Sequence, residues 1–362
     1  MYEKQFFGVF VGGVLLILCI VASISYIGDP GGVFQSDNGK YENKMVDILL
    51  SGHNVTFKEN IDWGRFQSAF IARDPAIRDT IVLGSSRVMV INNAMLDSLP
   101  IPKDRNFLNS WVADAKLGDE IAVVMNYAQK SEIPKTIIIG LDPPSFDREG
   151  LVFPSQDLQY NRGLEKIGYS PGIWDGLAFM DNKCFELISY SNLIAAIQKI
   201  RSGEIGVNLT QTDDLMGEDW VNSWDGTRAF PQIRRERTTE EVEKEARAFI
   251  AANGTWKMKP KQVAIFEGFT GYLLQHHVSV ILFLPPWHPI IYEKFKKDPG
   301  YSMVLESENY IRKYAEDKHI TVIGSYDPGR YNFTSADFYD ATHLKPDAVA
   351  RIFADGDIGG QL

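Results

Sequence analysis

An uncharged apolar segment near the amino terminus constrains this chain more than any other feature of its sequence. Residues 6–27 read FFGVFVGGVLLILCIVASISYI and contain no Asp, Glu, Lys or Arg. As a helix, at about 1.5 Å per residue, they extend roughly 33 Å, which is enough to cross the hydrocarbon core of a bilayer. A cleaved signal peptide usually has an apolar region of only about 7–15 residues, and a helix of a soluble core usually keeps a polar face. The segment therefore predicts one uncleaved membrane anchor over residues 1–28.

The flanks of this segment indicate its orientation. Lys4 and the free amino terminus precede it, and positive charge favours the cytoplasmic side. We therefore expect a single-pass membrane protein whose remaining residues are extracytoplasmic, in the periplasm or at the cell surface. A soluble cytoplasmic lipase-like enzyme is the alternative if the segment does not span the membrane.

Charge and cysteine content exclude further classes of function. The chain has 37 Lys and Arg against 47 Asp and Glu, a net charge of −10, which disfavours binding to nucleic acid. Cys19 falls inside the predicted anchor and Cys184 far outside it, so we predict no disulfide. The sequence has no cluster with metal-ligand spacing and no nucleotide-binding loop pattern, so we predict no metal and no other cofactor.

Strand and helix patterns alternate after the anchor. Continuous apolar runs rich in β-branched residues suit strands of a parallel sheet, which is covered on both faces. Five such runs occur, at residues 80–84, 106–109, 136–140, 278–284 and 320–324. Apolar residues at helical spacing occur at 114–131, 240–252, 262–276, 303–319 and 345–354. This alternation predicts βαβ units and a doubly wound α/β domain.

The spacing of the predicted strands indicates how the chain is divided. The third and fourth strands are too far apart for one crossover, so residues 143–259 are predicted to be an insertion with a helix near 189–201. Residues 29–78 are polar and are predicted to be a linker with one helix. The α/β domain is then expected over residues 79–362.

Two short motifs at the predicted sheet edge carry candidate chemistry. Ser86 follows the first predicted strand, where backbone N–H groups at a helix start can stabilise negative charge. Asp340 and His343 have the spacing Asp-x-x-His before the last predicted helix, so Asp340 can orient His343 and His343 can take a proton from a serine. Both motifs are expected at the carboxyl edge of the sheet, where ligands bind. Taken singly, the serine could be a helix N-cap and the Asp-x-x-His a pair of turn residues.

The combination of motifs resembles the SGNH, or GDSL-like, hydrolase superfamily over residues 80–355, interrupted by the insertion. Matched position by position, the resemblance implies Ser86 as nucleophile, Asp340 as orienting acid and His343 as base. It also implies a three-layer α/β/α domain with a five-stranded, flavodoxin-like parallel sheet. The Gly-Ser-Ser form, the anchor and the insertion look like the DltD- and AlgJ-type members. Those are extracytoplasmic proteins that act on polymer acylation beside a membrane-bound O-acyltransferase.

Two motifs of this superfamily are matched poorly. Where its members usually have a glycine that donates from the backbone, residues 109–114 read NSWVAD. Where they usually have Gly-x-Asn, residues 140–142 read GLD, and an ionised Asp142 cannot donate a hydrogen bond to an oxyanion. Asp142 could instead be protonated, bind a substrate hydroxyl or hold Arg87. The oxyanion hole is then expected to consist of the Ser86 N–H and another group.

Further candidate substrate-binding residues lie near the same edge. The fourth predicted strand ends in LPPWHP, where Trp287 can stack on a sugar ring or pack under the insertion. His288 can contact substrate or serve as an alternative base. Arg87 and Arg148 can meet anionic groups of a substrate. The mixed-charge run at residues 234–241 is predicted to be a solvated helix face.

These features lead to two competing expectations. The first is an anchored serine esterase or O-acyltransferase that acts, through an acyl-enzyme, on acyl and above all acetyl esters of a cell-envelope polysaccharide. The second is a non-catalytic SGNH-like binding or scaffold protein that presents such a glycopolymer to a membrane-bound O-acyltransferase. The second expectation is motivated by Asp142 and by the missing glycine.

Overall fold

A parallel sheet of five strands lies at the centre of the α/β body in the computed structural model. Its strands are β2 (Thr80–Leu83), β3 (Phe107–Asn109), β4 (Thr136–Gly140), β8 (Ser279–Leu284) and β9 (Thr321–Gly324), in the order β3-β2-β4-β8-β9. The structure describes residues 2–28, 40–57, 61–169, 187–202, 209–252 and 255–355. All five predicted strands are confirmed, and their continuous apolar runs are buried, as expected for a sheet covered on both faces.

The register of the sheet aligns the ends of its strands. Leu83 pairs with Ile139 of β4, Gly140 pairs with Phe283 of β8, and Leu284 pairs with Gly324 of β9. The loops that follow β2, β4, β8 and β9 therefore leave the sheet along one edge. Every candidate site residue predicted from the sequence lies in one of these loops or in the loop before the last helix.

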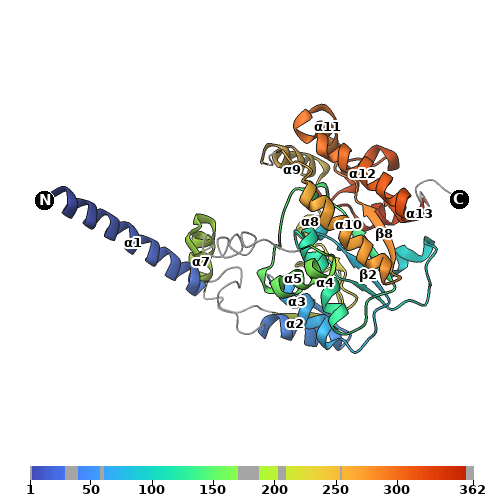
Figure 1. Cartoon of the computed structure of the whole chain (residues 1–362), viewed down its shortest axis with the longest axis horizontal. Coiled ribbons are helices and arrows are strands. Elements are labelled where there is room, and N and C mark those ends of the chain that lie inside the picture. The colour runs from blue at the N-terminus through green and yellow to red at the C-terminus, as the bar shows by residue number, and fades with distance from the viewer. Residues whose placement is uncertain are drawn as a thin grey trace.

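The predicted helices between the strands are also confirmed. They are α4 (Leu117–Gln129), α9 (Thr239–Ala252), α10 (Pro260–Gln275), α12 (Ser302–Lys318) and α13 (Pro346–Ala354), and α11 (Pro289–Lys297) follows β8. Figure 1 shows α10, α12 and α13 grouped with β8 at the carboxyl-terminal side of the body. Their buried faces join the apolar core, to which Ile121, Phe269 and Val349 contribute completely buried side chains.

Residues 40–78 are more ordered than a linker with one helix. They form α2 (Lys40–Leu50), strand β1 (Asn54–Thr56) and α3 (Trp63–Arg73), while residues 29–39 and 58–60 of the predicted linker lie outside the described part of the chain. Phe66 and Phe70 are four positions apart on α3 and are both buried in the core. The segment is polar on average, but one apolar face on each helix is enough to dock it on the body.

The inserted residues build a second, smaller sheet together with β1. β5 (Thr210–Thr212), β6 (Val221–Asn222) and β7 (Arg228–Ala229) join it in the antiparallel order β5-β1-β6-β7. The helices of the insertion include α5 (Asp157–Lys166), α7 (Tyr190–Ser202), which matches the predicted helix, and α8 (Gln232–Arg235). Cys184 lies outside the described residues.

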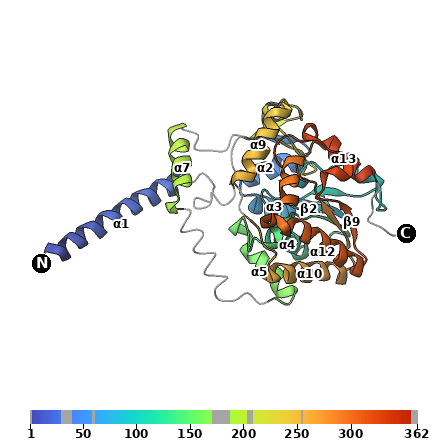
Figure 2. The ribbon, with the colours of Figure 1, turned by 90° about the horizontal axis from the view of Figure 1, so that it is seen from above.

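The amino-terminal segment is one continuous helix, α1 (Tyr2–Gly28). Its stretch Gly8–Gly28 is long and apolar enough to cross a membrane. Figures 1 and 2 show α1 projecting away from the α/β body, with α7 beside its carboxyl-terminal end. Most apolar side chains of α1 are exposed, so they are not part of the protein core.

Candidate active site

Ser86 begins a short 3₁₀ helix, Ser86–Val88, directly after β2. Between strand and helix, Gly84 has a φ of +140°, and a Cβ there would lie 2.9 Å from the carbonyl oxygen of Gly140. Only glycine fits both the backbone angle and this close approach to β4. Ser85, not Ser86, is the N-cap, because the Ser85 hydroxyl accepts a hydrogen bond from the backbone N–H of Arg87. The Ser86 hydroxyl is therefore left for another partner.

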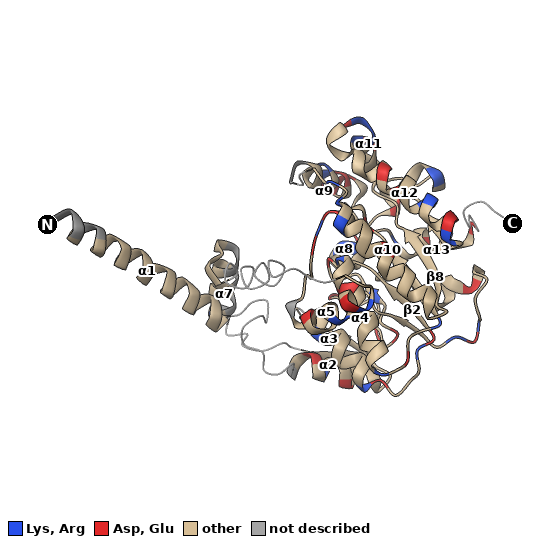
Figure 3. Cartoon of the chain, in the orientation of Figure 1, with Lys and Arg blue, Asp and Glu red and all other residues tan. Residues whose placement is uncertain are grey.

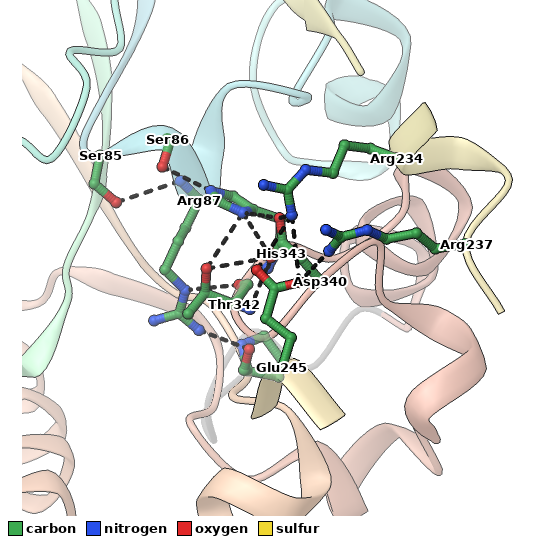
Figure 4. A network of polar contacts seen from close by, with 10 residues as sticks. Ser85, Ser86, Arg87, Arg234, Arg237, Glu245, Asp340, Thr342 and His343 are labelled. Atoms are coloured by element: carbon green, nitrogen blue, oxygen red, sulfur yellow. Dashed lines mark hydrogen bonds and ion pairs between the residues drawn. The ribbon is translucent and has the colours of Figure 1, made fainter. Parts of the chain in front are cut away.

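That partner is His343. The Ser86 Oγ lies 2.7 Å from Nε2 of His343, and Nδ1 of His343 lies 2.8 and 2.9 Å from the two carboxylate oxygens of Asp340. Figure 4 shows this chain of polar contacts. The structure therefore brings together the three residues that the sequence marked as candidate nucleophile, base and orienting acid, in hydrogen-bond order.

The loop around Asp340 holds its carboxylate in the ionised form. Burial by itself would raise the pKa of Asp340. The hydrogen bond and charge of His343, with the backbone N–H groups of Thr342 and His343, outweigh burial and hold the pKa well below its usual range. Asp340 can thus accept the Nδ1 proton of His343 in a hydrogen bond, which leaves Nε2 free to face Ser86 as a base.

The insertion contacts the same pair from outside the sheet edge. A guanidinium nitrogen of Arg234 lies 3.7 Å from Asp340 and 3.2 Å from Glu245, which also pairs with Arg237. The ring of Phe230 meets the His343 ring edge-on at 5.4 Å between centroids. The interpretation of residues 234–241 as a solvated helix face is wrong for Arg234, because α8 turns this side chain toward Asp340.

Asp142 follows β4 and forms a network of its own. It pairs with Arg87 and accepts a hydrogen bond of 2.6 Å from the Ser85 hydroxyl. Arg87 also donates to the carbonyl oxygens of Pro285 and Pro286, at 2.8 and 2.6 Å. Of the three roles considered for Asp142, holding Arg87 is the one that the structure shows. This network connects the loops after β2, β4 and β8.

A cavity of about 270 Å³ opens beside Ser86 and His343. Phe249, Trp256 and Trp287 form an aromatic part of its wall, and the charged side chains in the wall are Arg87, Asp114, Lys116, Asp142 and Arg148. Burial lowers the pKa of Lys116, whose ammonium donates to the carbonyl oxygens of Glu149 and Leu151. The volume suits a small group next to the Ser86 hydroxyl.

Two of the predicted substrate-binding residues are constrained by packing. Trp287 lines the cavity, but it is buried against Trp256 of the insertion, and the Arg87 guanidinium lies 4.1 Å from its ring centre. His288 is completely buried and does not line the cavity. It is the N-cap of α11, where its Nδ1 accepts a hydrogen bond from the backbone N–H of Ile290. Burial lowers the pKa of His288 to about 4. Arg148 does reach the cavity wall, where it pairs with Asp114 at 3.0 Å.

Asp114 ends the segment 109–114, where the glycine donor of the SGNH superfamily is missing, and the sequence did not mark it as a site residue. It lines the cavity with a φ of +53°, in the left-handed region that glycine favours. Within the described part of the chain, no protein oxygen accepts a hydrogen bond from the backbone N–H of Asp114 or of Ser86. Two signals were available: its place in the segment 109–114, and the fact that aspartate tolerates this conformation better than most residues with a side chain.

Neither a protein-family model nor a curated protein matches this chain. The geometry of Ser86, His343 and Asp340 is therefore the main support for a functional proposal.

Proposed function

We propose that the chain is an extracytoplasmic, membrane-anchored serine esterase or O-acyltransferase. The observation that carries this proposal is the pair of hydrogen bonds from Ser86 to His343 and from His343 to Asp340. Serine is a weak nucleophile at neutral pH without a base, and a histidine oriented by a carboxylate is the usual base. The cavity beside the Ser86 hydroxyl leaves space for a small acyl group, with acetyl as the favoured candidate.

The proposed reaction has two steps at Ser86. First, Oγ attacks the carbonyl carbon of an ester while His343 Nε2 takes the hydroxyl proton. Collapse of the tetrahedral intermediate then breaks the ester bond, and the leaving alcohol receives the proton from His343. Second, water or a sugar hydroxyl gives a proton to His343 and attacks the acyl-enzyme. Collapse of the second tetrahedral intermediate breaks the ester bond to Ser86 and releases the acid or a new ester. The proton on His343 returns to Ser86 Oγ. Asp340 stays ionised throughout and stabilises the imidazolium.

The oxyanion of each intermediate needs hydrogen-bond donors near the cavity. The backbone N–H groups of Ser86 and Asp114 are the proposed donors, since both residues line the cavity and neither group has a protein acceptor within the described residues. Asp142 accepts from Ser85 and pairs with Arg87, so it does not supply a third donor. One missing donor typically costs about 10²–10³ in rate, which predicts a slow enzyme.

The substrate class and setting follow from the resemblance to the SGNH hydrolases. The strand order β3-β2-β4-β8-β9 and the positions of Ser86 and Asp340 after the first strand and before the last helix are consistent with a flavodoxin-like SGNH domain with helices on both faces. The resemblance to the DltD- and AlgJ-type members favours acyl esters of a cell-envelope polysaccharide as substrate. It also favours a membrane-bound O-acyltransferase as partner. The apolar α1 is consistent with such a site, with the catalytic domain outside the cytoplasm.

Labelling with a fluorophosphonate tests the proposal, because this reagent forms a covalent bond only with an activated serine. We expect the wild-type chain to be labelled, Ser86→Ala and His343→Ala not to be labelled, and the control Ser145→Ala to be labelled normally. Ser145 lines the same cavity but has no hydrogen bond to His343. Equal labelling of wild type and Ser86→Ala, or none of wild type, would overturn the serine mechanism.

A non-catalytic scaffold that presents a glycopolymer to an acyltransferase is the second candidate. The observation that favours it is the engagement of Asp142 by Arg87 and Ser85, where the SGNH superfamily usually has an amide donor. Turnover of an ester that depends on both Ser86 and His343 would exclude this candidate.

A further inference from the structure

Helix α7 stands apart from the α/β body and contacts α1. Figures 1 and 2 show α7 beside the carboxyl-terminal end of α1 and crossing it. α7 belongs to the insertion, so more than 160 positions separate it from the helix it contacts. The cavity at Ser86 does not include any α7 residue. The proposed catalytic chemistry therefore does not explain its position.

The contact between the two helices depends on small residues. A Cβ at Gly28 would lie 2.5 Å from the Cβ of Ala196 and 2.6 Å from its Cα, so the approach requires glycine at this position. Ala196 and Ser25 are completely buried. Small residues at a helix crossing allow the close backbone approach that is common between helices in membranes.

The contact with α7 lies at the carboxyl-terminal end of α1. The apolar stretch of α1 ends at Gly28, and both Gly28, which meets Ala196, and the buried Ser25 belong to its last turn. If α1 spans a bilayer, its last turn lies where the hydrocarbon core meets the lipid headgroups. A helix that crosses α1 there lies close to the membrane surface.

The side chains of α7 suit that surface. Tyr190, Ile194 and Ile200 are 78%, 38% and 41% exposed, although the helix already packs on α1. The helix carries Lys199 and Arg201 and no acidic residue, in a chain with a net charge of −10. Figure 3 shows Asp and Glu recurring over the α/β body. Exposed Ile and Tyr with basic residues are typical of helices that lie in the interface of anionic membranes.

We propose that α7 is an interfacial helix that lies in the headgroup region of the same leaflet from which α1 emerges. Its exposed apolar side chains contact acyl chains, and Arg201 meets lipid phosphates. The insertion would then hold the α/β body to the membrane at a second point. This inference rests on α1 being membrane-embedded, and it is independent of the chemistry at Ser86.

Site-specific fluorescence in vesicles tests the proposal on the full chain. Cys19 and Cys184 are replaced by serine, and an NBD group is attached at Ile194→Cys or at the control Ile77→Cys, which is 65% exposed on the α/β body. The vesicles contain phosphatidylcholine with a minority of phosphatidylglycerol. We expect doxyl-labelled lipid to quench position 194 at least about threefold more than position 77, and aqueous iodide to show the reverse order.

Two outcomes would overturn the proposal. Equal quenching by doxyl lipid at positions 194 and 77 would mean that α7 is in water. A blue-shifted NBD spectrum at 194 without doxyl quenching would mean that protein, such as a second copy of the chain, covers the helix. Gly28→Leu is a second variant, which should separate α7 from α1 and reduce doxyl quenching at 194 by about half or more. An unchanged near-ultraviolet circular dichroism spectrum in that variant would show that the α/β body is still folded.

Discussion

The imidazole Nε2 of His343 lies 2.7 Å from the hydroxyl oxygen of Ser86, although 257 positions separate the two residues in the chain. The parallel sheet makes this possible, because Ser86 follows β2 and the loop that holds His343 precedes α13 at the same edge. Asp340 completes the arrangement from the loop of His343 itself. The three groups therefore should act as one unit.

Removal of one member of this unit should remove most of the catalytic rate. We expect Ser86→Ala and His343→Ala each to lower kcat by about 10⁴-fold or more, and Asp340→Asn by about 10³–10⁴-fold. Hydrolysis of 4-nitrophenyl acetate by the purified chain measures these rates. The double variant Ser86→Ala/His343→Ala should be no slower than either single variant, since each already disables the serine. Multiplicative losses in the double variant would contradict a shared mechanism.

Arg234 should tune the acid limb of the pH profile. Its guanidinium lies 3.7 Å from Asp340, so the neutral Arg234→Gln leaves more uncompensated negative charge beside His343. That charge favours the imidazolium, and we expect the acid limb of kcat/KM to move to higher pH by about 0.5 unit. Activity should return nearly to the wild-type value at alkaline pH.

Two matched variants separate this effect from a loss of structure. Arg234→Lys keeps the charge and should keep the wild-type profile. Arg247→Gln removes an arginine of α9 that pairs with the non-catalytic Glu243, and it should leave the profile unchanged. A uniform loss of activity at every pH in Arg234→Gln would assign Arg234 a purely structural role.

Asp114 should matter through its backbone and not through its carboxylate. Because its φ is +53°, glycine and asparagine can replace it without strain, and we expect Asp114→Gly and Asp114→Asn to keep kcat within about threefold. A β-branched residue in this conformation costs about 1–2 kcal/mol, which should displace the N–H donor. Asp114→Val should therefore lower kcat by about 10–10²-fold, measured with the same ester. Comparable losses in all three variants would point to the carboxylate instead.

Asp142 should contribute to stability more than to the oxyanion hole. Its Arg87 partner is buried, so Asp142→Asn leaves a cation without its counter-charge. We expect the free energy of unfolding to fall by about 2–4 kcal/mol, although the bonds of Arg87 to Pro285 and Pro286 remain. Urea unfolding in detergent measures this loss. An Asp142→Asn protein with unchanged stability would show that the pairing of Asp142 with Arg87 does not stabilise the fold.

Strands and the three site residues could be predicted because their signals are local. Each strand is a continuous β-branched run, and the carboxyl edge of a parallel sheet gathers the residues that follow such runs. Ser86 follows the first run directly, and Asp340 and His343 share one short loop. The role of His288 had a local signal too, because Pro289 at the first position of a helix indicates that the preceding residue is its N-cap.

The rest of the site depends on how distant segments return to the sheet edge. A run of alternating charges looks the same whether it is solvated or faces a carboxylate, so Arg234 could not be assigned from sequence. The left-handed backbone of Asp114 and the pairing of Asp142 with Arg87 likewise follow from tertiary packing. Residues 29–78 were predicted to hold one helix, and the structure has two, α2 and α3, because a polar average composition hid the apolar face that each helix has.

Asp119 should give the protein a stability that falls as pH rises between about 4 and 6. Burial raises the pKa of Asp119 from 3.8 to about 6, although backbone N–H groups of Lys116, Val152 and Phe153 oppose the rise. In that range the native carboxyl holds its proton while the unfolded one has lost it, so the contribution of Asp119 to the unfolding free energy falls with rising pH and is level above about 6. At about 1.4 kcal/mol per pKa unit, the loss is roughly 3 kcal/mol. Urea unfolding from pH 4 to pH 7 should show a steeper fall in the wild type and in the exposed control Asp104→Asn than in Asp119→Asn. Parallel curves for the wild type and Asp119→Asn would refute the role of Asp119.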